Sequence, residues 1–87
     1  MAATKIQLLY FASLKEQLGV GEESLSLETV TSVADLVALL AARGGSWQTA
    51  FSGQQPLLAA VNQLLCGPET VLQSGDEVAF FPPVSGG

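Results

Sequence analysis

Short runs of alternating apolar and polar residues dominate the chain, and this two-residue period is typical of β-strands with one buried face. The first run, residues 5–11, sends two sets of side chains to opposite faces: Ile6, Leu8 and Tyr10, and Gln7, Leu9 and Phe11. Because both faces carry apolar residues, we predict a central strand, or a strand whose second face meets a partner.

Four further strands are predicted over residues 24–28, 57–61, 64–66 and 77–81. The run 57–61 is continuously apolar, which indicates a buried strand, and Asn62 and Gln63 turn the chain into the next one. The last strand again has two faces, formed by Val78 and Phe80 on one side and by Ala79 and Phe81 on the other.

The strongest helical signal follows residue 32. Ser32 and Asp35 have the spacing of an N-terminal capping box. Arg43 is expected to complement the helix dipole in the last turn, and Gly44-Gly45 to end the helix. Apolar residues recur at the spacing that forms one helical face: Val33, Leu36, Val37 and Leu40.

Two shorter helices are predicted. Ser13 and Glu16 have capping-box spacing at the start of the first, and Gly19 is expected to end it. The second covers residues 46–51 and is expected to place its two aromatic side chains over the core. A hairpin, a crossover helix and further strands together predict the α+β class.

The last six residues form an unusual segment. Pro82 and Pro83 fix φ and lack N–H donors, so the sheet ladder must end near them and the chain continues extended. Fully extended, six residues reach on the order of 20 Å, and the two terminal glycines can enter a narrow slot. We therefore predict a domain at residues 1–81 and a projecting tail at residues 82–87 that presents the carboxylate of Gly87 to another protein.

Composition narrows the classes of function. Of the 87 residues, 48% are hydrophobic and 13% are charged, which excludes intrinsic disorder and indicates one small domain. The net charge is −5, and the three dispersed cations Lys5, Lys15 and Arg43 argue against nucleic-acid binding. An acidic surface fits a basic protein partner, and the apolar excess suggests an exposed docking surface.

Few reactive side chains are present. The sequence has no histidine and one cysteine, Cys66, which excludes disulfides and His/Cys metal sites within one chain and predicts no bound cofactor. Cys66 is expected to be a small buried residue. No run approaches the ~18–20 apolar residues of a membrane span, and no secretory signal is visible, so we expect a cytoplasmic protein with no membrane contact.

Three segments of the sequence resemble the ubiquitin-like β-grasp sulfur carriers, and more narrowly the small subunit of molybdopterin synthase, the MoaD family. They run from Leu8 to Ala12, from Leu57 to Gln63 and, above all, from Ser74 to Gly87. One departure is Ser85, where threonine is usual. The resemblance covers essentially the whole chain and implies a β-grasp fold, in which a mixed sheet of about five strands wraps around one main helix beside short helices.

The resemblance also implies a function. The carboxylate of Gly87 would be adenylated by an ATP-dependent activating enzyme and converted to a thiocarboxylate by a sulfur donor. Its sulfur would then attack a cyclic pyranopterin phosphate in the large synthase subunit, and two such transfers would form the molybdopterin dithiolene. The complex would be a heterotetramer of two small and two large subunits. The chain would be no enzyme by itself, since it lacks an acid/base cluster.

Partner contacts are predicted on one face of the sheet and along the tail. Leu9, Phe11 and Phe81 share the face that the main helix does not need, so they are candidates for an apolar docking patch. The alternative for Phe81 is burial in the second face of the core. Further contacts with the large subunit would come from Pro82, Pro83, Val84, Ser85 and Gly86.

Three other functions are compatible with this tail. A sulfur carrier for thiamine synthesis or tRNA thiolation would also end in Gly-Gly, although those relatives lack the Phe-Phe-Pro-Pro block. A ubiquitin-like modifier would join Gly87 to a lysine through an isopeptide bond. A plain interaction module would have a terminus without function, as frayed glycine ends usually are.

Overall fold

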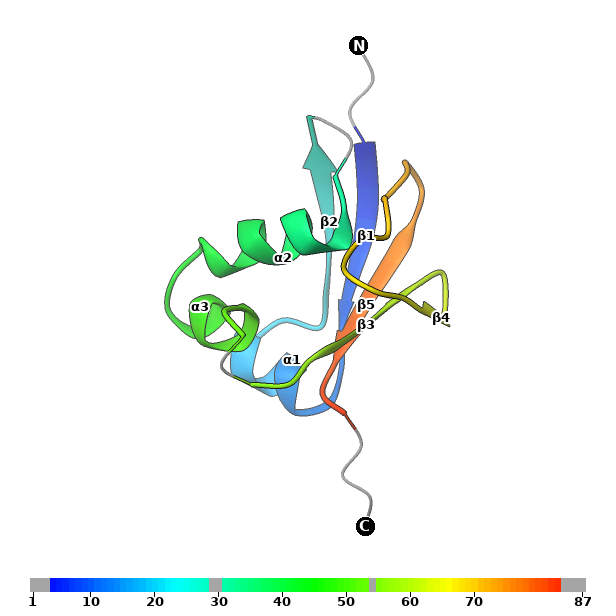
Figure 1. The fold of residues 1–87 in the computed structure, drawn as a ribbon. Coiled ribbons are helices and arrows are strands. Elements are labelled where there is room, and N and C mark those ends of the chain that lie inside the picture. Colours follow the sequence, from blue (N-terminus) through cyan, green and yellow to red (C-terminus); the bar gives the residue numbers. More distant parts are fainter. Residues whose placement is uncertain (1–3, 29–30, 54, 84–87) are drawn as a thin grey trace.

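The computed structural model describes residues 4–28, 31–53 and 55–83, and its centre is a five-stranded sheet (Figure 1). The strand order is β2-β1-β5-β3-β4, with β1 and β5 parallel and the other neighbours antiparallel. This mixed sheet with its helices confirms the predicted α+β class. Within these ranges the strands are β1 (Thr4–Tyr10), β2 (Glu22–Leu27), β3 (Leu58–Val61), β4 (Leu64–Leu65) and β5 (Glu77–Phe81), and the helices are α1 (Ala12–Leu18), α2 (Val33–Ala41) and α3 (Ser46–Phe51).

The core lies between one face of the sheet and the helices, which gather on that side (Figure 1). Because side chains alternate along a strand, every second residue of the two central strands enters this core. The predicted faces of both strands are confirmed. The inward residues of β1 and β5 are Ile6, Leu8, Tyr10, Val78 and Phe80, and the helices add Leu14, Leu36, Leu40 and Phe51.

The start of α2 matches its prediction, but the residue expected near its end does not. The Ser32 hydroxyl accepts a hydrogen bond from the Asp35 amide at 3.2 Å, and the Asp35 carboxylate accepts one from the Ser32 amide at 3.4 Å, which completes the capping box. The predicted role of Arg43 at the helix dipole is wrong. The helix ends at Ala41, and Arg43 pairs instead with Glu23 of β2 at 2.8 Å.

The predicted capping box of α1 is also wrong. The N-cap is Phe11, whose side chain makes no capping hydrogen bond, and Ser13 falls inside the first turn. The cause is the strand before it, because the Phe11 amide still donates to the Phe80 carbonyl of β5 at 3.2 Å. The helix therefore starts directly from the sheet, through Ala12 at φ 57. Gly19 ends it in the left-handed conformation, as predicted.

Strand β3 is less buried than its apolar run predicts. Only Ala60 is buried, and Leu58 is 40% exposed, because its outer neighbour β4 has two residues and covers little of it. The predicted turn is confirmed, with Asn62 and Gln63 at φ 52 and 72.

The Asn62 side chain fastens this turn to the start of β5. Its amide group donates to the Asp76 carboxylate at 3.0 Å, and its carbonyl oxygen accepts from the Glu77 amide at 3.0 Å. The Asn62 backbone amide donates to the Glu77 carbonyl at 2.8 Å. Two sequence segments that carry the family resemblance are thus joined by hydrogen bonds.

Candidate functional site

The outer face of the sheet, opposite the core, carries three rows of side chains that follow from the strand register. The middle row is apolar and the lower row, nearest the point where the chain leaves β5, is aromatic and aliphatic. The upper row is polar. The middle row contains Leu9, Ala79, Ala60 and Leu65, the lower row contains Phe81 and Leu58, and the upper row contains Gln7 and Glu77.

A groove of about 610 Å³ runs across these rows and is called the outer groove below. Ala79 and Ala60 lie opposite each other in β5 and β3, and these small side chains leave its floor low. Larger side chains form the walls of the groove. Two of these wall residues are strongly exposed, namely Phe11 at 48% and Leu65 at 71%. Its lining includes Leu9, Phe11, Ala60, Leu65, Ala79 and Phe81. Exposed apolar side chains gathered around one hollow are typical of a protein-binding surface.

The structure brings the three predicted docking residues together. Leu9, Phe11 and Phe81 all line the outer groove. The alternative that Phe81 enters the core is wrong, since Phe81 is half-buried on the opposite face and its neighbour Phe80 fills the core.

The chain leaves the sheet at the aromatic end of this groove. Strand β5 ends at Phe81, half-buried Pro82 lines the groove, and Pro83 is exposed. The predicted end of the ladder at the prolines is confirmed. The four tail residues Val84, Ser85, Gly86 and Gly87 lie outside the described residues, so their contacts and the role of Gly87 stay predictions.

Sequence reasoning missed six groove residues, which are Ala12, Ala60, Gln63, Leu65, Glu77 and Ala79, and Leu65 is the most exposed of the apolar ones. The signal was present in the two-residue turn, because a turn at positions 62–63 places Leu65 directly opposite Ala60. Treating residues 57–61 as a buried strand concealed it, since that interpretation gives the strand no solvent face.

A second cluster of polar and aromatic groups lies where β1, β2 and α3 meet. Tyr10 donates its phenolic O–H to the Glu23 carboxylate at 2.8 Å, and Arg43 binds the same carboxylate at 2.8 and 3.0 Å. The Arg43 guanidinium also lies 4.3 Å from the centre of the Trp47 ring.

The electrostatics of this cluster indicate a structural role. The hydrogen bonds from Arg43 hold the pKa of Glu23 below its usual value, and those to Glu23 raise the pKa of Arg43. Burial, with the bond to Glu23, raises the pKa of Tyr10 far above its usual value. Each group has its partner within the cluster, which joins α3 to the sheet.

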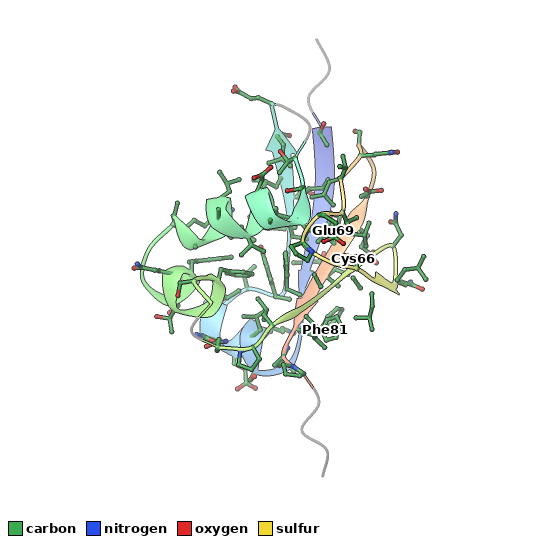
Figure 2. The ribbon with its side chains drawn as sticks, in the orientation of Figure 1. Cys66, Glu69 and Phe81 are labelled. Carbon is green, nitrogen blue, oxygen red and sulfur yellow. The ribbon has the colours of Figure 1, made fainter. Side chains whose placement is uncertain are left out.

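Cys66 follows the groove residue Leu65 but does not itself line the outer groove. Figure 2 shows Phe81 near the point where the chain leaves β5, with Cys66 and Glu69 farther up the molecule. Cys66 is half-buried rather than buried, and its thiol donates to the Ala59 carbonyl at 3.7 Å. It lines a largely apolar cavity of about 330 Å³ next to α2 and α3.

The described residues contain neither a cluster of metal-binding side chains nor a helix able to span a membrane. In that part of the chain, no three Asp, Glu or Cys side chains are grouped so that they could bind a metal ion. None of the helices described there has the length and hydrophobicity to span a membrane.

Comparison with known proteins gives a consistent result. Residues 8–87 match the model of the ThiS family. The molybdopterin synthase sulfur carrier subunits of Haemophilus influenzae and Escherichia coli are 40% and 42% identical to this chain, over 94% of its length and 99% of theirs. The chain belongs to the ThiS family. Its similarity to the molybdopterin synthase sulfur carrier subunits spans nearly its whole length and confirms the resemblance found in the sequence.

Solved structures of two archaeal proteins share the fold of this ThiS-family chain. A putative molybdopterin converting factor, subunit 1, from Pyrococcus furiosus matches with a TM-score of 0.77 at 28% identity, over 93% of this chain and 99% of that protein. The small archaeal modifier protein 1 from Methanosarcina acetivorans matches with a TM-score of 0.75 at 25% identity, over 100% of both chains. These matches confirm the ubiquitin-like β-grasp fold.

Proposed function

We propose that this chain is the sulfur carrier subunit of a molybdopterin synthase and that the carboxylate of Gly87 carries the sulfur. The observation that carries the proposal is the 40% and 42% identity to two such subunits over 99% of their length. The outer groove supports it, because an exposed apolar hollow lies beside the point where the tail begins.

Activation of Gly87 requires an ATP-dependent enzyme, because a carboxylate is a poor electrophile. A carboxylate oxygen attacks the α-phosphorus of ATP, pyrophosphate leaves, and an acyl-adenylate forms. The outer sulfur of a donor persulfide then attacks the acyl carbon, and AMP leaves. A thiol of the donor cleaves the resulting acyl disulfide, which releases the thiocarboxylate and leaves a disulfide on the donor.

Transfer takes place inside the large subunit. The tail at residues 82–87 enters its pocket, and the terminal sulfur attacks an oxygen-bearing carbon of a cyclic pyranopterin monophosphate. The new C–S bond replaces a C–O bond, whose oxygen stays with the phosphate or leaves as water. Hydrolysis of the acyl–sulfur bond leaves the sulfur on the pterin and returns the Gly87 carboxylate. Two such cycles complete the dithiolene that binds molybdenum.

The two subunits divide the chemistry between them. The chain has three cations in 87 residues, and Arg43 is engaged by Glu23, so the large subunit supplies the groups that bind the substrate phosphate. The small subunit contributes the nucleophile and the outer groove as its docking surface, and two copies join a large-subunit dimer in a heterotetramer. Persulfide chemistry of this kind suits the reducing cytoplasm.

The mass of the intact protein tests the proposal. Incubation with ATP, the activating enzyme and a sulfur donor is expected to raise the mass by the difference between sulfur and oxygen. The tail fragment is expected to carry that difference on Gly87, and a chain without Gly87 is expected to keep its mass. A wild-type mass that stays unchanged, under conditions that charge a known sulfur carrier, contradicts the proposal.

A second candidate function is conjugation to other proteins, because the fold match with the archaeal modifier protein is as complete as that with the converting-factor subunit. Both functions use an acyl-adenylate at Gly87. Incubation with ATP, the activating enzyme and acceptor proteins separates them, since a modifier gives slower-migrating species with an isopeptide bond to lysine. Sulfur carriers give the thiocarboxylate without these species.

A further inference from the structure

We propose that Glu77 and Gln63 form a polar corner of the outer groove that pairs with a lysine or arginine of the large subunit. This inference rests on the proposed function, because it takes the large subunit as the occupant of the groove. It adds a chemical requirement for that partner, namely a cation at a defined distance from the entrance of its tail pocket.

The register of the sheet fixes the position of Glu77, and the turn at residues 62–63 brings Gln63 to the lining of the same groove. Glu77 begins β5 and pairs with Gln7 of β1. Its backbone carbonyl accepts a hydrogen bond from the Asn62 backbone amide at 2.8 Å, and its backbone amide donates one to the Asn62 side-chain oxygen at 3.0 Å. Both Gln63 and Glu77 line the groove. Four residue steps along the strand separate Glu77 from Phe81, so the corner lies ~13 Å from the end of the sheet, where the tail begins.

Both side chains are available for a partner. Neither the carboxylate of Glu77 nor the carboxamide of Gln63 makes a hydrogen bond or an ion pair within residues 4–28, 31–53 and 55–83. The contrast is Glu23, whose carboxylate is held by Arg43 and Tyr10. Carboxylates that are covered by an apolar partner lose their hydration, and this is unfavourable unless the partner supplies a cation.

The distribution of charge around the groove selects the sign of the partner group. No lysine or arginine lines the outer groove. At the tail end, the neighbouring hollow that shares Leu9 and Phe11 has both Lys15 and Glu22 in its lining. The corner at Glu77 is therefore the acidic end of the groove, on a chain whose net charge is −5.

The backbone at Gln63 gives independent support. This residue has φ 72, in the left-handed region that glycine favours in two-residue hairpin turns. Glutamine is strained there, and its side chain makes no contact that offsets the strain through a hydrogen bond within the described residues. A hydrogen bond from the Gln63 carboxamide to the partner accounts for glutamine at this position.

The test measures the affinity of the large subunit for the full-length chain by calorimetry at two salt concentrations. Glu77→Lys is expected to weaken binding by about ten-fold or more, and the isosteric Glu77→Gln by about three-fold with a weaker salt dependence. Gln63→Gly is expected to weaken binding by about three-fold, since the change removes the carboxamide from a backbone that glycine tolerates. The matched control is Glu28→Lys, an exposed carboxylate outside the groove, which changes the net charge equally.

The outcomes separate this inference from the proposed function. Wild-type chain that does not bind the large subunit overturns both. Binding that is weakened equally by Glu77→Lys and Glu28→Lys overturns the corner alone, because the effect is then one of net charge. A thermal melt of each variant shows whether it folds. If Glu77→Lys does not fold, Glu77→Gln decides, and an unchanged affinity with an unchanged salt dependence overturns the inference.

Discussion

Strands β1 and β5 each have an inner face that packs against the helices and an outer face that lines the groove. On the inner face, Tyr10, Val78 and Phe80 are buried with the helices. On the outer face, Leu9, Ala79 and Phe81 line an open groove of about 610 Å³. Adjacent residues of one strand thus face a packed core and an exposed groove, which is the proposed docking surface. Stability and partner binding are expected to respond to different substitutions that are one residue apart.

The sharpest pair of variants is Phe80→Ala and Phe81→Ala. Phe80 is 1% exposed, so its truncation is expected to lower the free energy of unfolding by about 3–5 kcal/mol. Phe81→Ala is expected to lower it by less than about 1 kcal/mol and to weaken binding of the large subunit by about 2 kcal/mol, roughly 30-fold. Urea unfolding and calorimetry measure the two quantities, and equal loss of stability in both variants contradicts the comparison.

A smaller effect is expected at the edge of the sheet, where Leu64 and Leu65 are exposed at 73% and 71%. Leu65 lines the outer groove and Leu64 does not. Leu65→Ser is therefore expected to weaken binding by about ten-fold, and Leu64→Ser is expected to leave it unchanged. Both variants should melt within a few degrees of wild type. Equal effects on binding would mean that the partner follows the strand edge rather than the groove.

These two pairs also show what sequence could predict. Strict alternation in residues 5–11 and 77–81 predicted both faces of both strands, and Ser32 with Asp35 predicted the start of α2. Leu65 was missed because it is exposed only as a consequence of lying in β4, the short strand at the edge of the sheet. The sequence alone does not show which strand occupies that edge. Local capping rules failed at Phe11 because a bond to Phe80, distant in sequence, holds its backbone. They failed at Arg43 because Glu23 of β2 competes for its charge.

The cluster of Tyr10, Glu23 and Arg43 allows a test based on the pH dependence of stability, separate from partner binding. Arg43 lowers the pKa of Glu23 in the folded chain, so Glu23 contributes stability that is fully present above its unfolded pKa, near 4.5. That stability is lost as the pH falls through the lower folded pKa. Glu23→Gln is expected to lower the free energy of unfolding by about 1 kcal/mol at pH 7 and to flatten its decline below pH 4.5.

The measurement for Glu23 is urea unfolding of wild type and Glu23→Gln between neutral and acidic pH. Affinity for the large subunit at pH 7 serves as the control, because the cluster lies outside the outer groove. Parallel curves of stability against pH for the two proteins would show that the ion pair does not contribute.

A small effect on stability is expected at Gln63, and it has the opposite sign. Gln63→Gly relieves the strain of a positive φ, so the free energy of unfolding is expected to rise by about 0.5–1 kcal/mol while binding weakens. Thermal melts measure the stability and calorimetry measures the affinity for the large subunit, both on one preparation of Gln63→Gly. A variant that is both less stable and equally well bound would show that Gln63 serves the turn rather than the partner.

The measurement that most directly tests the account is product formation by the full chain and by a chain that lacks Gly87, each with the large subunit, activating enzyme, ATP and sulfur donor. The account predicts that deletion abolishes dithiolene formation. It also predicts that the melting temperature of the chain and its affinity for the large subunit stay nearly unchanged. Dithiolene formation by the truncated chain at the wild-type rate would contradict it.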